Sequence, residues 1–270
     1  FSVLISVYYK ENSEFLKRAF ESIWDLQSLK PSQIVLVEDG PLTDDLNAEI
    51  QRQKELLGER LTVVSLEKNV GLGVALAEGL KACKYDLVAR MDGDDIADKD
   101  RFLNQIDFLK ANPDISVVGS FISEFEGNER NIYAYRTPPA THADIYNFAK
   151  KRNPINHMTV MFKKDAVMSV GGYMPFMGFE DYYLWVRMLK QGLLFANIPK
   201  YLVNARAGLA MVGRRGGLKY AISEYKLQKE FFGLGFINFG EFLFNTSIRF
   251  LSRIVPEPIR IALYQKALRR

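Results

Sequence analysis

The first half of the chain repeats one unit four times, a short apolar run followed by a segment with helical periodicity. The apolar runs are Val3–Val7, Ile34–Val37, Leu61–Leu66 and Leu87–Met91. The helical segments are Phe15–Leu26, Asp45–Leu57, Gly73–Ala82 and Arg101–Ala111. Strands that are joined through helices run parallel and have both faces covered. The repeat therefore predicts an α/β fold in which a mostly parallel central sheet is flanked by helices.

The pattern becomes less regular after the fourth unit. Residues 116–139 contain turn residues between apolar runs, which predicts short strands. Beyond them we expect strands at Met158–Phe162 and Tyr201–Ala205, and a helix at Glu180–Gln191. The chain after Gly216-Gly217 is helical in pattern and rich in Phe. These residues predict a helical C-terminal extension to the α/β fold.

Composition limits the setting in which the chain works. With 270 residues, 48% of them apolar, it can bury a full core. Its one cysteine, Cys83, cannot form an intramolecular disulfide, which indicates a reducing, cytoplasmic location. Phe1–Tyr9 is apolar but short and lacks the basic leader and cleavage site of a signal peptide. We expect a buried strand there.

Ligands of such sheets bind outside the carboxyl ends of the strands, so the loops after the strands are the first place to search. All four loops in the first half are polar. They are Lys10-Glu11-Asn12, Glu38-Asp39-Gly40-Pro41, Lys68-Asn69 and Asp92-Gly93-Asp94-Asp95. We expect these loops, which are distant in sequence, to converge at one edge of the sheet.

Three carboxylates lie within four positions at the end of the fourth expected strand. Asp92, Asp94 and Asp95 repel one another unless a positive charge lies between them. Oxygen ligands favour Mg²⁺ or Mn²⁺, which bind through one or two carboxylates together with substrate phosphates. The alternative is a solvated acidic turn whose aspartates cap the next helix. We expect a metal site, because the cluster ends the most central strand.

Four other features admit both a functional and a purely structural interpretation. Glu38-Asp39 can accept hydrogen bonds from a base or a ribose, or can belong to an Asp-Gly-Pro turn. Glu180-Asp181 can supply a catalytic base beside aromatic side chains, or can stabilise a helix N-terminus. Arg214-Arg215 can clamp a diphosphate or form a basic surface turn. His157 can be a core residue or a ligand near the metal.

Together these residues resemble the family 2 glycosyltransferases of the GT-A fold. Within that family they are similar to bacterial enzymes of amylovoran, O-antigen and capsular polysaccharide biosynthesis. The resemblance covers essentially the whole chain and rests on the order and spacing of its motifs. These are Ser2-Val3-Leu4-Ile5-Ser6-Val7-Tyr8-Tyr9, Glu38-Asp39-Gly40, Asn69-Val70-Gly71, Asp92-Gly93-Asp94-Asp95, Gly171-Gly172-Tyr173, Glu180-Asp181 and Arg214-Arg215-Gly216-Gly217. It implies a catalytic domain at residues 1–212, divided into a nucleotide-binding half (1–115) and an acceptor half (116–212), and an extension at 213–270.

The resemblance also implies a role for each matching position. Asp39 would contact the uracil and Asp92 the ribose, while Asp94, together with Asp92, would bind the metal. Asp181 would deprotonate the acceptor hydroxyl, in a single displacement that inverts the anomeric centre. The other residues expected around the nucleotide and the sugars are Tyr8, Glu11, Glu38, Asn69, Arg90, His157, Gly172, Glu180, Arg214 and Arg215. Many relatives have Pro-Thr-Tyr-Asn where this chain has Ser6-Val7-Tyr8-Tyr9, so only Tyr8 and backbone contacts carry over from that motif.

The implied substrates are a UDP-hexose, with glucose or galactose as the sugar, and a saccharide linked to undecaprenyl diphosphate. The enzyme would then work as a peripheral protein at the cytoplasmic face of the plasma membrane, and we expect no nucleic-acid partner.

The C-terminal region carries most of the positive charge, with 11 Lys/Arg against 4 Asp/Glu in residues 211–270. Residues 231–248 contain six phenylalanines and a single charge, Glu241, and are too polar to span a bilayer comfortably. Basic residues follow, a pattern that favours an interfacial helix on anionic lipid. They are Arg249, Arg253, Arg260, Lys266, Arg269 and Arg270. The alternative is that the phenylalanines pack on the catalytic domain or form a homodimer contact.

Other protein classes fit the sequence less well. Gly71-Leu72-Gly73 resembles the start of a dinucleotide fingerprint, but Leu76 occupies the third glycine position. A phosphohydrolase would carry its aspartyl nucleophile after an early strand, where this chain has Tyr8-Tyr9. A nucleotidyltransferase would need a Gly-rich phosphate loop after the first strand. The remaining alternative is a sugar-binding or assembly protein that has kept the fold without turnover.

Overall fold

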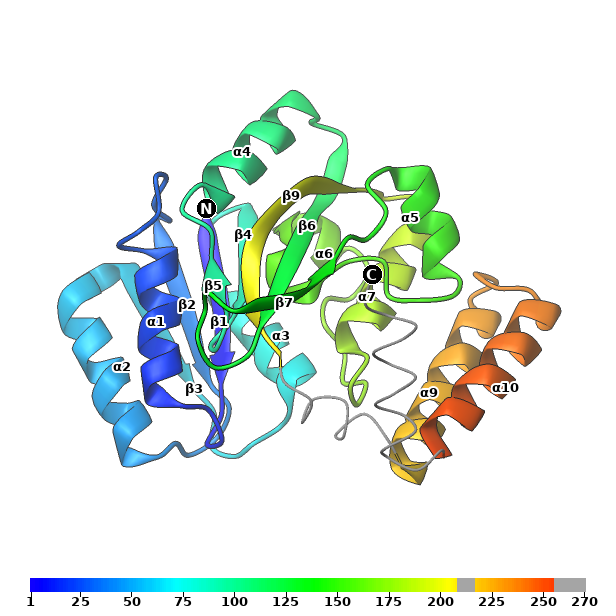
Figure 1. The fold of residues 1–270 in the computed structure, drawn as a ribbon, viewed down its shortest axis with the longest axis horizontal. Coiled ribbons are helices and arrows are strands. Elements are labelled where there is room, and N and C mark those ends of the chain that lie inside the picture. Colours follow the sequence, from blue (N-terminus) through cyan, green and yellow to red (C-terminus); the bar gives the residue numbers. More distant parts are fainter. Residues whose placement is uncertain (208–216, 255–270) are drawn as a thin grey trace.

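The computed structural model describes residues 1–207 and 217–254, with side chains described as far as residue 250. Within these ranges nine strands form one sheet, with helices on both faces (Figure 1). The strands are β1 (Ser2–Val7), β2 (Gln33–Glu38), β3 (Leu61–Ser65), β4 (Leu87–Asp92), β5 (Ile96–Ala97), β6 (Ile115–Phe125), β7 (Ile132–Arg136), β8 (Met161–Lys163) and β9 (Leu194–Arg206). The α-helices are α1 (Ser13–Ile23), α2 (Asp44–Leu57), α3 (Leu72–Ala82), α4 (Arg101–Ala111), α5 (His142–Ala149), α6 (Lys164–Met168), α7 (Glu180–Lys190), α9 (Leu218–Gly233) and α10 (Phe239–Ile254). Two 3-10 turns are η1 (Gly58–Arg60) and η2 (His157–Thr159).

The sheet is parallel in its first half and mixed in its second. Its order is β3-β2-β1-β4-β8-β6-β9-β5, and β7 pairs with β6. The four strands expected from the repeat, β1 to β4, pair in parallel as predicted. Beyond them β8 runs antiparallel to both β4 and β6, whereas β9 runs parallel to β6. The α/β fold is therefore confirmed, and β4 with its acidic end lies in the interior of the sheet.

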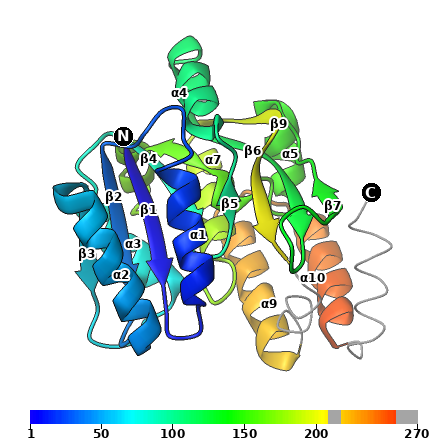
Figure 2. The ribbon, with the colours of Figure 1, turned by 60° about the vertical axis from the view of Figure 1, so that its left-hand side comes forward.

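The helices form two layers because side chains alternate between the faces of each strand. On β1, Val3 and Ile5 face a core built with α1, α2 and α4, whereas Leu4 faces a core built with α3, α7 and α9. Figure 2 shows α1 and α2 on one side of β1 and β2, with α3 behind them. Gly79 brings α3 close to the sheet, since a Cβ there would lie 2.4 Å from Val37 and 2.5 Å from Leu4.

The second half departs from the strand boundaries expected from sequence. β9 begins at Leu194, seven residues before the predicted Tyr201, and β6 is one strand of 11 residues where short strands were expected. The polar interruption that hid β9 is a bulge, in which Pro199 and Lys200 lie between the residues paired with Ser120 and Phe121. The predicted strand at Met158–Phe162 begins instead as the turn η2, because the Thr159 hydroxyl donates to the carbonyl of Asn156 at 2.8 Å.

The predicted helical extension is present as α9 and α10, which we call the C-terminal hairpin. Figure 1 shows it beside α7. Leu227, Phe231, Phe236 and Ile237 belong to the same core as α3 and α7. Phe231 lies edge-on to Tyr182 of α7, with ring centroids 4.9 Å apart. The hairpin is thus part of the core of the molecule, although several of its phenylalanines remain exposed.

Candidate active site

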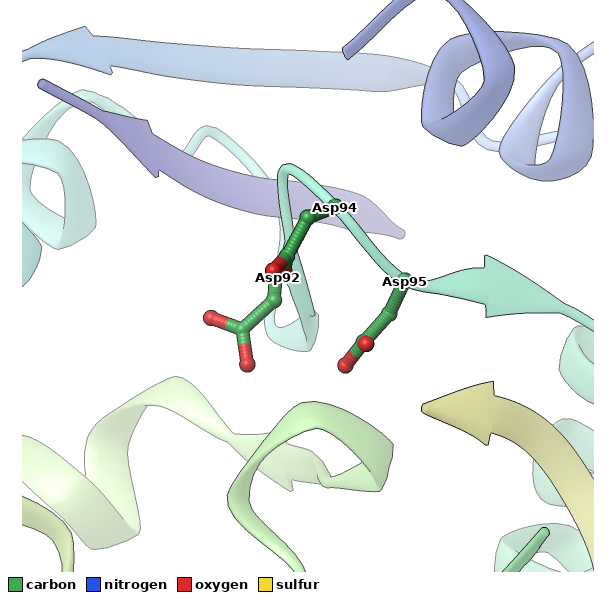
Figure 3. Close-up of side chains that lie close together, drawn as sticks. All are labelled: Asp92, Asp94 and Asp95. Atoms are coloured by element: carbon green, nitrogen blue, oxygen red, sulfur yellow. The ribbon is translucent and has the colours of Figure 1, made fainter. Parts of the chain in front are cut away.

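The acidic loop between β4 and β5 gathers its three carboxylates in one place. Oxygens of Asp92, Asp94 and Asp95 lie within 4.8 Å of one another. Figure 3 shows the three side chains pointing into the same space, with the end of β9 alongside Asp95. On β4, Val88 faces the core that contains α7, and alternation places Arg90 and Asp92 on that same face.

The end of β9 holds this loop in position. Asp95 is only 2% exposed, and its Oδ1 accepts a hydrogen bond from the backbone N–H of Arg206 at 2.7 Å. The Arg206 side chain donates from Nε to the backbone carbonyl of Asp94 at 3.1 Å. Its guanidinium lies over the rings of Phe15 and Phe125, 3.7 and 4.6 Å from their centroids. Arg206 therefore fixes the loop backbone.

The electrostatics of the loop favour a bound cation. Burial, followed by the charge of Asp92, raises the pKa of Asp94 to about 6. Burial, followed by Asp94, raises the pKa of Asp95 well above its ordinary value. The second carboxylate oxygen of Asp95 has no hydrogen-bond partner among the described residues. Carboxylate oxygens that repel one another, one of them unpartnered, fit a divalent cation with oxygen ligands, Mg²⁺ or Mn²⁺.

Arg90 is one of the positive charges beside this cluster. Its side chain is 3% exposed and makes an ion pair with Asp92. Its Nε and Nη1 have no hydrogen-bond partner in the part of the chain that the structure describes. Arg90 thus contacts Asp92 directly, and its role in binding the nucleotide or the sugars stays a prediction.

The loops after β2 and β3 meet at Asp39, which is 4% exposed. Its carboxylate accepts from the backbone N–H of Val70 at 2.7 Å and of Gly71 at 3.1 Å, and from Asn69 Nδ2 at 3.1 Å. Glu38 accepts from the hydroxyl of Ser65 on β3. Asp39 and Asn69 are therefore brought together as expected, at the start of α3. Contact between Asp39 and uracil stays a prediction.

The two carboxylates at the start of α7 have different surroundings. Asp181 Oδ2 accepts from Asn153 Nδ2 at 2.6 Å, and its Oδ1 accepts from the backbone N–H of Tyr182 at 2.7 Å. Glu180 lies against α3, where a Cβ on Gly73 would approach its Cγ to 2.8 Å. Burial, with a smaller effect of the Asp181 charge, raises the pKa of Glu180 from 4.5 to about 7. The carboxyl with a near-neutral pKa is thus Glu180.

His157 is packed among aromatic side chains near Arg90. Its Nε2 lies 2.9 Å from the hydroxyl of Tyr173, and its ring packs edge-on to Trp185 at 6.0 Å. Burial, with the nearby Arg90, holds the pKa of His157 well below its usual range. Among the described residues, the cluster that could hold a metal ion consists of Asp92, Asp94 and Asp95 and does not include His157. Of its two interpretations, the contacts favour the core residue.

Each of the remaining expected residues either makes a backbone hydrogen bond or lies outside the described part of the chain. Gly172, in a left-handed conformation with φ 69°, presents its carbonyl to Arg187 Nη2 at 2.7 Å. Tyr8 follows β1, and its carbonyl accepts from the backbone N–H of Glu11 at 3.0 Å. Arg214 and Arg215, like the basic residues after Ile254, lie outside the described residues, so the diphosphate clamp stays a prediction.

Two residues that hold the candidate site residues, Arg206 and Asn153, were not expected in that role from sequence. Arg206 directly follows the strand expected at Tyr201–Ala205. A search of the residues after every expected strand, and not only after the first four, could therefore have found it. Asn153 gives no such signal, since it lies in a loop 28 residues before its partner Asp181.

Comparison with known proteins now identifies the family. Residues 2–173 match the model of the family "Glycosyl transferase family 2". The chain belongs to glycosyl transferase family 2. It is 42% identical to the amylovoran biosynthesis glycosyltransferase AmsE of Erwinia amylovora over 98% of each chain. It is 38% identical to the UDP-Gal:alpha-D-GlcNAc-diphosphoundecaprenol beta-1,3-galactosyltransferase of Escherichia coli, over 100% of this chain and 97% of that one.

Solved structures agree on the fold of this family 2 glycosyltransferase. The mannosyltransferase PcManGT from Pyrobaculum calidifontis, solved with GDP-Man and Mn²⁺, gives a TM-score of 0.65 at 17% identity, over 98% of this chain and 75% of that chain. S. aureus TarS residues 1–349, solved with UDP-GlcNAc, gives a TM-score of 0.63 at 16% identity, over 96% of this chain and 68% of that chain. The predicted GT-A type of α/β fold is therefore confirmed.

Proposed function

We propose that this glycosyltransferase transfers a hexose, with galactose favoured over glucose, from its UDP-sugar to a saccharide on undecaprenyl diphosphate. The reaction forms a β-linkage and releases UDP. The extended lipid-linked saccharide then serves bacterial surface polysaccharide synthesis. Support for the substrates comes from the names of the two relatives above, one of which is a UDP-Gal-dependent enzyme acting on a diphosphoundecaprenol acceptor.

The observation that carries the proposal is that an acidic cluster ends β4 while a pair of carboxylates lies in the first turn of a helix packed on the same face of the sheet. The cluster at the end of β4 contains Asp92, Asp94 and Asp95, and Asp181 lies in the first turn of α7, which packs against the face of the sheet to which Asp92 points. Asp94, with Asp92 or Asp95, would hold Mn²⁺ or Mg²⁺. That ion would neutralise charge on the leaving diphosphate.

Asp181 then acts on the acceptor side. Its carboxylate accepts the proton of the acceptor hydroxyl as that oxygen attacks the anomeric carbon, and the bond from that carbon to UDP breaks on the opposite side. An α-linked donor therefore gives a β-linked product. A protein that only binds sugars would need no base at this position.

Donor selectivity can be read from thermal unfolding in a panel of nucleotide sugars with and without Mn²⁺. We expect UDP-Gal with Mn²⁺ to give the largest rise in Tm, since a ligand at a hundredfold excess over Kd stabilises by about 2.7 kcal/mol. GDP-mannose serves as the mismatched control. Formation of a hexosylated lipid product from the best donor completes the test. Binding without any turnover on lipid-linked acceptors would favour the non-catalytic alternative.

We also propose that the C-terminal hairpin rests on anionic membrane at the cytoplasmic face. No helix among residues 1–207 and 217–254 is both long and apolar enough to cross a bilayer. The hairpin instead exposes large apolar side chains beside lysines, the composition of an interfacial surface. The apolar residues are Leu218, Ile222, Tyr225, Phe232, Phe239, Leu243, Phe244, Ile248 and Phe250. The exposed lysines are Lys219, Lys226 and Lys229.

Substitution of the most exposed apolar residues tests the membrane contact. Phe239 and Phe244, each 61% exposed, and Leu243 lie outside the core, so serine at all three should leave the fold intact. We expect sedimentation with anionic vesicles to fall at least about tenfold, because each side chain buried in lipid contributes about 1.5–3 kcal/mol. Leu56→Ser, at an exposed site on α2, is the matched control. A change in oligomeric state with unchanged vesicle binding would assign the surface to a dimer instead.

A further inference from the structure

Asn153, which donates a hydrogen bond to Asp181, lies in a short segment that follows α5. Asn153 donates from Nδ2 to Asp181 Oδ2 at 2.6 Å, and its Oδ1 accepts from the backbone N–H of Ile155 at 3.4 Å. The two bonds fix which end of the amide faces the carboxylate. Next to Asp181, the hydroxyl of Tyr182 donates to the carbonyl of Ala149 at 2.6 Å, at the start of the same segment.

The C-terminal hairpin holds this segment from the other side. On α10, Asn245 donates from Nδ2 to the carbonyl of Lys150 at 2.8 Å. One turn further along the helix, Arg249 donates to the carbonyl of Lys151. Two backbone carbonyls that precede Asn153 are therefore held by side chains four positions apart on one helix face.

Both α10 side chains are themselves fixed by α9. Asn245 Nδ2 also donates to Gln228 Oε1 at 3.0 Å. Arg249 forms an ion pair with Glu224, which is 1% exposed. A buried carboxylate is tolerated only when it is paired, so the orientation of Arg249 is set by Glu224. A hairpin that served only as a membrane anchor would not need polar side chains directed at a loop backbone.

We propose that Asn245 and Arg249 position the catalytic base: they hold residues 150–153 so that Asn153 donates to Asp181 and orients its carboxylate toward the acceptor. The inference rests on the proposed function, in which Asp181 takes the acceptor proton. Asn245, Arg249 and Asn153 are positioning residues, because none of them takes part in the proton transfer. The C-terminal hairpin is then part of the active site, whatever its outer surface binds.

The kinetic test uses the full chain and two hairpin variants that leave no buried charge unpaired. These are Asn245→Leu, and Arg249→Gln combined with Glu224→Gln. We expect kcat for hexosyl transfer to fall about 10- to 100-fold in each, the effect of one lost hydrogen bond to a charged group, with KM for the donor unchanged. Asn153→Ala should give the same loss. Adding Asn153→Ala to either hairpin variant should cause no further loss, since both act through one contact.

A matched control removes a different tether of the hairpin. Lys190 donates from Nζ to the carbonyl of Gly235 at 3.1 Å, at the turn between α9 and α10, and this bond involves none of residues 150–153. Lys190→Ala should lower Tm while kcat stays at the wild-type value. Equal losses of kcat in Lys190→Ala and the hairpin variants, or losses that add to that of Asn153→Ala, would overturn the positioning role.

Hydrogen exchange supplies a readout that does not depend on activity. In both hairpin variants the backbone amides of residues 151–153, 155 and 156 should exchange faster than in the wild type, and Lys190→Ala should leave them unchanged. If the wild type transfers no hexose, the proposed function fails, and exchange still decides whether the hairpin holds the segment. Unchanged exchange at these amides contradicts the inference even when the wild type is active.

Discussion

Asp181→Asn should reduce hexosyl transfer by about 10²- to 10⁴-fold, the range of a lost general base. The asparagine side chain has nearly the same shape and can still accept from the backbone N–H of Tyr182, so α7 should keep its start. The Tm and the donor-induced rise in Tm should therefore stay near the wild-type values. The measurement is kcat for UDP release with a lipid-linked acceptor, and near-normal turnover would remove Asp181 from the mechanism.

The neighbouring carboxylate gives the matched control. Glu180→Gln should keep kcat within about tenfold of the wild type, because Asp181 is intact. It should also alter stability in a defined pH window. The folded-state pKa of Glu180 is raised from 4.5 to about 7, so folding favours its protonated form, and the contribution of this side chain to stability falls as pH rises from 4.5 to 7.

Glutamine mimics the protonated form of Glu180. The variant should therefore be more stable than the wild type at pH 8, by at most about 3 kcal/mol, and equal to it at pH 4. Thermal unfolding at both pH values checks this. A loss of kcat in Glu180→Gln as deep as that in Asp181→Asn would make Glu180 the base instead.

Asp94→Asn should abolish the response to Mn²⁺ and lower transfer at least about 10²-fold, because the charge that holds the cation at the diphosphate is lost. The variant should nevertheless fold well without metal. Removal of one of three mutually repelling carboxylates lowers the repulsion within the loop, so its metal-free Tm should match or exceed that of the wild type. The measurements are the Mn²⁺ dependence of kcat and the Mn²⁺-dependent rise in Tm with UDP.

The other two aspartates identify the second ligand. Asp92 makes an ion pair with Arg90, whereas Asp95 has one carboxylate oxygen without a hydrogen-bond partner among the described residues. Asp92→Asn and Asp95→Asn can therefore be compared directly by the concentration of Mn²⁺ that gives half-maximal activity. The variant that needs more Mn²⁺ has lost a ligand. A normal Mn²⁺ response in Asp94→Asn would contradict the assignment of Asp94 as the metal ligand.

The amino-acid sequence by itself determined the four βα units and the loops where chemistry gathers. These features are local: the period of apolar residues sets each strand or helix, and the end of a strand sets the position of Asp92, Asp94 and Asp95. The mapping of Asp181 onto the first turn of α7 was equally accessible, since carboxylates at a helix start have a sequence signature.

Only the tertiary structure decided which side chains hold these groups. Arg206 donates a hydrogen bond to Asp95, 111 residues away in sequence, and Asn153 donates one to Asp181, 28 residues away. The periodic pattern of a strand or helix does not extend over such separations. The bulge at Pro199 hid the continuity of β9, because its strand character comes from pairing with β6 and not from alternation. The sequence predicted the C-terminal hairpin only as an extension, because its contacts to Lys150 and Lys151 depend on where α10 packs and not on a local pattern. Local patterns thus located the candidate reactive groups, and long-range packing gave them their partners.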